Sequence, residues 1–153
     1  PRAATPPRRL EALRQLSAAG VPTAVMVAPI VPAINDAEIE RILDAAAALG
    51  VSGAGYVMLR LPLEVRDLFR EWLMANYPDR YRHVFKLVRE MRGGKDYDST
   101  WGTRMKGSGP YAWMIGRRFE VACEKLGLNA DRAKLTTEHF CPPIKRAEQL
   151  SLF

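Results

Sequence analysis

The sequence predicts an α/β fold, because a strand, a helix and a second strand follow one another within about forty residues. Residues 23–31 and 54–61 are short and almost entirely apolar, which is typical of strands buried on both faces of a sheet. The residues between them carry apolar side chains at helical spacing. A unit of this kind makes the two strands parallel and its crossover right-handed.

A helix is predicted ahead of this unit. Thr5 stands at the N-cap position and Pro6 at the first helical position, where the missing N–H of proline costs nothing. Gly20 ends the run. The apolar residues of this helix, at helical spacing, are Leu10, Leu13 and Leu16.

The helix between the two strands is predicted to begin at a capping-box-like pair, Asn35 and Glu38. Gly50 stops this helix, and Pro62 ends the strand that follows it.

After Pro62 the pattern becomes mainly helical. We expect residues 63–127 to form a helical extension, interrupted by a polar, glycine-rich loop at residues 93–109. Residues 128–153 show no period and are expected to form an irregular tail. The last predicted helix carries one apolar stripe, which consists of Trp113, Gly116, Phe119, Cys123 and Leu126.

Composition limits the classes of function. The chain of 153 residues has 23 Lys and Arg against 17 Asp and Glu, a net charge of +6, which permits an anionic partner such as nucleic acid or is ordinary surface charge. Its two cysteines suggest neither a zinc site nor a disulfide framework, so we expect no metal site and a cytoplasmic protein. No apolar run approaches ~18 residues, so we expect no membrane contact.

Several segments, in a fixed order, resemble a known family. They are Arg8–Leu13, Ala19–Thr23, Val25–Pro32 with Asn35 and Asp36, Gly55–Pro62, Arg92–Asp98 and Gly109–Ala112. Together they resemble the radical S-adenosylmethionine (SAM) superfamily, in particular its spore-photoproduct-lyase-like proteins, often labelled DNA repair photolyases. The resemblance covers nearly the whole chain and depends on order and spacing rather than on one motif.

The resemblance implies that residues 1–62 are the later β/α units of a TIM-type radical SAM barrel, within the C-terminal half of a longer lyase-like enzyme. In that family a three-cysteine loop binds a [4Fe–4S] cluster, and SAM is cleaved reductively to a 5′-deoxyadenosyl radical. The resemblance implies that this radical would then act on nucleic acid, for example in DNA repair. The chain has only Cys123 and Cys141. We therefore expect it to hold no cluster and to be inactive without the N-terminal half of the barrel.

The resemblance also implies that the late strands cradle SAM, largely through backbone groups. This role falls near Met26, Ala28, Pro29, Leu59 and Leu61. Arg60 is the one charged residue within either predicted strand, and it suits a carboxylate or phosphate at the barrel mouth. A structural ion pair, or a side chain that extends to solvent at a strand edge, explains Arg60 equally well. The sequence indicates no catalytic residue.

The polar loop is a candidate for a substrate-facing lid, since long polar loops with aromatic residues often carry function. A flexible connection between two helices is the alternative. The candidate substrate-binding residues of this loop are Lys95, Asp96, Tyr97, Trp101 and Arg104.

The last residues resemble the peptide by which bacterial replication and repair proteins bind the sliding clamp. Leu150, Leu152 and Phe153 would fill apolar pockets, and Gln149 would contribute amide hydrogen bonds. Alternatively, this apolar end packs back on the domain. A non-catalytic module that binds the sliding clamp or nucleic acid is therefore the second function consistent with the sequence.

Overall fold

The computed structural model describes residues 3–131 and 136–142. The predicted α/β class and the strand–helix–strand unit are confirmed. In chain order the elements are α1 (Pro6–Ala18), β1 (Ala24–Ile30), the 3-10 turn η1 (Asp36–Glu38), α2 (Ile39–Ala47), β2 (Gly53–Met58), α3 (Val65–Asn76), α4 (Tyr81–Glu90) and α5 (Gly109–Leu126).

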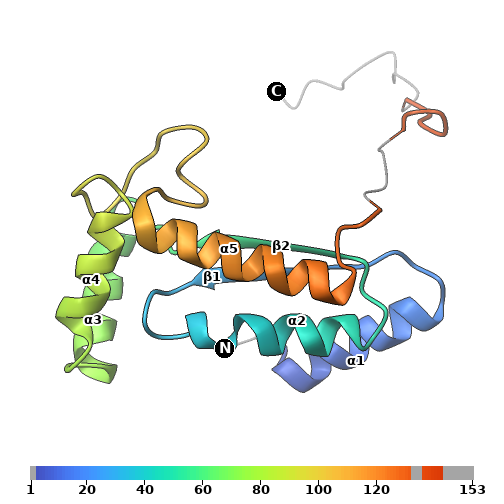
Figure 1. Ribbon diagram of the computed structural model, residues 1–153, viewed down its shortest axis with the longest axis horizontal. Helices are drawn as coiled ribbons and strands as arrows, with labels where there is room; N and C mark the ends of the chain where they lie inside the picture. Colours follow the sequence, from blue (N-terminus) through green and yellow to red (C-terminus); the bar gives the residue numbers. More distant parts are fainter. Residues whose placement is uncertain (1–2, 132–135, 143–153) are drawn as a thin grey trace, which may run out of the picture.

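β1 and β2 lie side by side as a parallel sheet (Figure 1). Residues pair in register from Ala24 with Gly53 onward, and the register shifts before Ile30, which pairs with Met58. Pro29 lies within the shifted stretch and has no N–H to donate to a ladder. Because the strands are parallel, both carboxyl ends lie at the same edge of the sheet.

One face of this sheet is covered by α2 and α5, which also pack against each other (Figure 1). The core between them contains Val27 of β1, Leu43 of α2, Met58 of β2 and Ile115 of α5. Burial of such side chains stabilises the fold by about 1.5–3 kcal/mol each.

The opposite face of the sheet is largely open in the described residues. Met26 is 62% exposed, and its side chain lies over Gly55, with the methyl carbon 3.0 Å from where a Cβ would stand. Ala24 and Ala28 are also exposed. The predicted burial of the strands on both faces is therefore wrong for this part of the chain, because both covering helices lie on one side.

The N-terminal starts of α1 and α2 differ from the predicted capping. Thr5 occupies the N-cap position of α1, but its hydroxyl makes no capping bond. Helix α1 buries no residue, and Leu16 is 44% exposed. The capping box before α2 is absent: Asn35 instead accepts a bond from the Val31 N–H at 2.7 Å and donates to the Pro29 carbonyl at 3.0 Å. Asn35 therefore shapes the loop after β1 rather than the start of the helix.

Helices α3 and α4 lie beyond the carboxyl ends of the strands, as a hairpin (Figure 1). A second core cluster joins Leu61, just after β2, to Leu73 of α3 and to Val84 and Val88 of α4. The expected helical extension is thus present. None of the helices in the described part of the chain is long and apolar enough to cross a lipid bilayer.

Helix α5 buries most of the predicted stripe, since Phe119 and Cys123 are buried and Leu126 packs against the core, but Trp113 does not belong to it. Trp113 is 71% exposed, and Gly116 lies against Tyr56, whose hydroxyl oxygen is only 2.9 Å from where a Cβ would stand. The small side chains of Ala112 and Ala122 let the helix approach the sheet closely. The buried residues include Ala112, Ile115, Phe119 and Ala122.

Asn129, just after α5, occupies the free edge of β2. The Ala54 N–H donates to its Oδ1 at 3.0 Å, and its Nδ2 donates to the Ala54 carbonyl at 3.0 Å. Asn129 has a φ of 64°, in the left-handed region that asparagine tolerates. Further along the same strand, the Met58 N–H donates to the Met105 carbonyl at 2.8 Å. Both backbone groups of Ala54 and the N–H of Met58 are therefore already bound at this edge.

Candidate functional site

The candidate site lies at the carboxyl ends of β1 and β2, where the loop at residues 93–109 and the α3–α4 hairpin meet the sheet (Figure 1). In β/α barrels and open parallel sheets, ligands bind at this edge. The sequence-predicted residues near it come from three segments: the end of β1, the end of β2 and the loop.

The chain after β1 is held by Tyr111 of α5. The Ala33 N–H donates to the Tyr111 hydroxyl at 3.3 Å, and the hydroxyl donates to Asp36 Oδ2 at 2.6 Å. Burial raises the pKa of Tyr111 well above its ordinary value, and the bond to Asp36 raises it further. Tyr111 therefore stays protonated and acts as a fixed link between α5 and the β1–α2 loop.

The loop after α4 is tied to β2 by Arg92, the one charged residue buried in the described part of the chain, with 3% exposure. Its guanidinium donates to the Leu59 carbonyl at 2.9 Å and to the Thr103 carbonyl at 3.0 Å. The Leu59 N–H in turn donates to the Ile30 carbonyl at 2.9 Å. These bonds hold the loop against the end of β2.

Arg60 and Tyr97 are brought together, although 37 positions separate them. Arg60 Nη2 donates to the Tyr97 hydroxyl at 3.1 Å, and Nη1 lies 3.6 Å from Met105 Sδ. Among the described residues Arg60 has no ion-pair partner, since the side chains that it contacts, Tyr97 and Met105, are neutral. The structural ion pair is therefore not found in the described part of the chain, whereas a side chain that extends to solvent is compatible with the half-buried position of Arg60.

The remaining loop residues are divided between two places. Asp96 forms an ion pair with Arg89 at 2.6 Å and a longer one with Arg70 at 3.7 Å. Trp101 is 82% exposed, and the Arg104 guanidinium lies over its ring at 4.4 Å. Lys95 lines a surface hollow beside Asp96 and Tyr97. The structure therefore gathers the Arg60–Tyr97 pair and, separately, an exposed Trp101–Arg104 pair.

The predicted SAM-binding residues also lie in two environments. Met26, Ala28 and Pro29 are exposed. Leu59 and Leu61 are 7% and 1% exposed and belong to the second core cluster, so their side chains face the protein interior. Any contact of these two leucines with a ligand is limited to main-chain groups.

Metal-ligating side chains do not gather in the part of the chain that the structure describes: no three His, Cys, Asp or Glu residues are grouped. Cys123 is buried in the core, where burial raises the pKa of its thiol, and Cys141 is exposed. The predicted clamp-binding residues, Gln149, Leu150, Leu152 and Phe153, lie outside the described residues, so that assignment stays a prediction.

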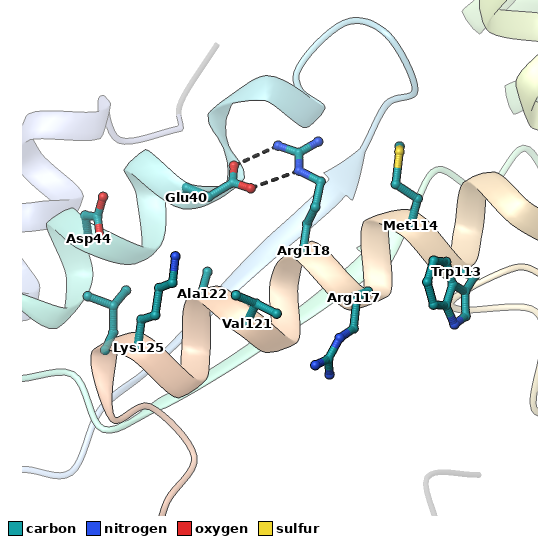
Figure 2. Close-up of a pocket in the computed structure, with 10 residues that line it drawn as sticks. Glu40, Asp44, Trp113, Met114, Arg117, Arg118, Val121, Ala122 and Lys125 are labelled. Atoms are coloured by element: carbon teal, nitrogen blue, oxygen red, sulfur yellow. Dashed lines mark hydrogen bonds and ion pairs between the residues drawn. The ribbon is translucent and has the colours of Figure 1, made fainter.

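A groove between α2 and α5 was not predicted from the sequence (Figure 2). Arg118 bridges it with two bonds to Glu40, of 2.9 and 2.7 Å, and also donates to the Asp36 carbonyl at 3.0 Å. Trp113 and Arg117 line the same groove. Because none of the sequence-predicted site residues lines it, the groove lies apart from the candidate site.

The Glu40–Arg118 pair predicts a small pH dependence of stability. The bond from Arg118 lowers the pKa of Glu40 below its ordinary value of 4.5. A lowered folded-state pKa contributes stability above the ordinary pKa, and this contribution is lost as the pH falls through the lowered value. In Glu40→Gln the free energy of unfolding should therefore decrease less than in the wild type as the pH falls from about 5 to about 3.

Urea unfolding at several pH values measures this effect. The Glu40 side chain is 42% exposed, so solvent screening limits the contribution to less than about 1 kcal/mol. Glu71→Gln is the matched control, since Glu71 is an exposed helical glutamate without an ion pair in the described residues. Equal pH profiles for the two variants would contradict the prediction.

Comparison with known proteins gives a distant and partial match. No family model and no solved structure matches the chain. Uncharacterised proteins of Mycobacterium tuberculosis and Mycobacterium bovis are 33% identical to it over 87 residues, which is 54% of this chain and 26% of each relative. The chain therefore spans about a quarter of the length of these curated relatives, whose names state no activity.

Proposed function

We propose that this chain forms the later β/α units of a radical SAM barrel, in a longer enzyme that cleaves SAM reductively and acts on nucleic acid. The observation that carries the proposal is the one-sided covering of the parallel sheet. In a β/α barrel, helices cover the outside of the strands, and the other face looks into the barrel. Here α2 and α5 cover one face, whereas Met26 and Ala28 are exposed.

The free edge of β1 supports the same proposal. Among the described residues, β1 pairs with β2 alone, and two strands make only a marginal sheet. Further strands from the same protein would complete it. The curated relatives, of which the chain spans about a quarter, are long enough to supply such strands.

The residues present fit SAM but not the cluster. Met26 and Ala28 offer apolar surface on the open face, and Arg60 lies at the end of the neighbouring strand. The only cysteines are Cys123 and Cys141, too few for the three-cysteine loop of this family. We therefore assign the cluster, which supplies the electron for SAM cleavage, to another part of the protein.

The exposed Trp101–Arg104 pair supports nucleic acid as the substrate. Aromatic rings and guanidinium planes stack on nucleobases, and this stacking is largely independent of sequence. The turn that presents Trp101 is held by Asp98, which accepts bonds from the N–H and hydroxyl of Thr100 at 3.0 and 2.7 Å. A fixed, exposed tryptophan next to a cation therefore suits an unstacked base.

The proposal is tested on the intact protein, purified anaerobically and reconstituted with iron and sulfide. We expect bound iron and sulfide in cluster amounts, and 5′-deoxyadenosine when SAM and a reductant are added. A protein that binds no iron and sulfide, or that forms no 5′-deoxyadenosine, would contradict the radical SAM assignment.

A substitution on the open sheet face tests where SAM binds. Met26→Asp should raise the KM for SAM about tenfold or more, because the new carboxylate would lose its hydration against the ligand. Met74→Asp is the matched control: Met74 is 45% exposed, but it lies on α3. If both variants keep the wild-type KM while the cluster forms, SAM does not bind at this face.

A further inference from the structure

Two guanidinium groups at the carboxyl end of β2 have only neutral partners among the described residues. Arg92 donates to the carbonyls of Leu59 and Thr103, at 2.9 and 3.0 Å. Arg60 donates to the Tyr97 hydroxyl at 3.1 Å. Neither positive charge is therefore balanced by a carboxylate in direct contact.

The acidic residues of the adjacent loop are bound elsewhere. Asp96 pairs with Arg89 at 2.6 Å and with Arg70 at 3.7 Å. Both oxygens of Asp98 accept bonds from the turn that follows, from the Thr100 hydroxyl at 2.7 Å and the Thr103 hydroxyl at 3.4 Å. The carboxylates of Asp96 and Asp98 therefore have other partners than Arg60.

Both arginines also retain an unused donor. The Nε atoms of Arg60 and Arg92 are buried and have no hydrogen-bond partner within residues 3–131 and 136–142. Burial lowers the pKa of Arg92 below its ordinary value; the charge of Asp98 opposes this, and the charge of Arg60 lowers the pKa further. Two like charges close enough to affect each other, each with an unpaired donor, are unfavourable unless an anion compensates them.

We infer that Arg60 binds an oxyanion, a carboxylate or a phosphate, with Tyr97 orienting its guanidinium and Arg92 adding positive potential from the interior. A guanidinium presents a planar set of donors that fits either group in a bidentate manner. Arg60 is half-buried, so a ligand can reach it while water is partly excluded. The site lies where ligands bind in parallel sheets.

This inference goes beyond the proposed cleavage of SAM and does not depend on the cluster. The oxyanion has two possible sources, the carboxylate of an amino-acid ligand and the phosphate of a nucleotide. S-adenosylhomocysteine carries the first group, and thymidine 5′-monophosphate carries the second. Binding of each to the intact protein is measured by titration calorimetry, with or without reconstituted iron.

Arg60→Gln should weaken binding of one of the two probes by about 10- to 100-fold, since a hydrogen-bonded charge pair is lost. The probe that is affected identifies the source of the oxyanion. Arg41→Gln, in which an exposed arginine of α2 paired with Glu38 is changed, should leave both affinities unaltered. If neither probe binds the wild type, or if Arg60→Gln binds both probes as tightly as Arg41→Gln, the inference is wrong.

Tyr97→Phe gives a second test that does not depend on how Arg60→Gln folds. It removes only the hydroxyl that contacts Arg60 and should weaken the same probe about fivefold, because the guanidinium loses its orienting bond. Unchanged affinity in a variant with the wild-type melting temperature would show that Tyr97 has no such role. Failure of SAM cleavage with retained binding would overturn the proposed function alone.

Discussion

Leu43→Ala should lower the free energy of unfolding of the intact protein by about 3 kcal/mol. Leu43 lies in α2 with 0% exposure, at the centre of the core that α2, α5 and the sheet share. Removing its branched side chain leaves a cavity that close-packed neighbours fill only in part. Urea unfolding followed by circular dichroism measures the change.

Ile42→Ala is the matched control for this variant. Ile42 is the preceding residue of the same helix and is 38% exposed, so it contributes less to the core. We expect a loss below about 1 kcal/mol, partly offset by the higher helix propensity of alanine. Equal losses for the two variants would mean that α2 does not present Leu43 to the sheet.

Arg92→Met should destabilise the protein by about 2 kcal/mol and free the loop at residues 93–109. Methionine fills a similar volume but leaves the Leu59 carbonyl without a donor, whereas the Thr103 carbonyl keeps its bond from the Gly107 N–H. Loss of a buried, unpaired charge offsets part of this cost. Urea unfolding measures the stability, and hydrogen exchange of the loop amides should become faster.

Arg82→Met controls for the loss of a positive charge, because Arg82 is exposed on α4, ten positions earlier in the chain. We expect its stability and loop exchange to match the wild type within about 0.5 kcal/mol. If Arg92→Met is no less stable than Arg82→Met and exchanges at the same rate, Arg92 does not anchor the loop.

The local fold was predictable from periodicity, but the covering of the sheet was not. The apolar runs and the helical pattern between them correctly indicated a strand–helix–strand unit. They could not indicate that α5, separated by the α3–α4 hairpin, covers the same face as α2. In α5, Phe119 and Cys123 were correctly placed in the buried stripe, but Trp113 was wrongly included because it is large and apolar, whereas the alanines that allow close packing carry a weak sequence signal.

Individual residues of the candidate site were predictable from the sequence, but the contacts between them were not. Arg60 was indicated as the one charged residue within a predicted strand, and loop composition indicated Tyr97, but their hydrogen bond depends on how the loop folds back. That return is set by the bonds of Arg92 to two carbonyls and by the bond of the Met58 N–H to Met105. A buried arginine at the end of a helix has no pattern that distinguishes it from an exposed one.

The amide of Asn129 makes the two edges of the sheet unequal. By offering one donor and one acceptor to Ala54, it imitates the backbone of a neighbouring strand. A further strand that paired at Ala54 would have to displace this side chain, so strand addition, the route by which sheets join into fibres, is disfavoured at that point of the β2 edge. Among the described residues the edge of β1 carries no such side chain, so the β1 edge is the more accessible one for a neighbouring strand.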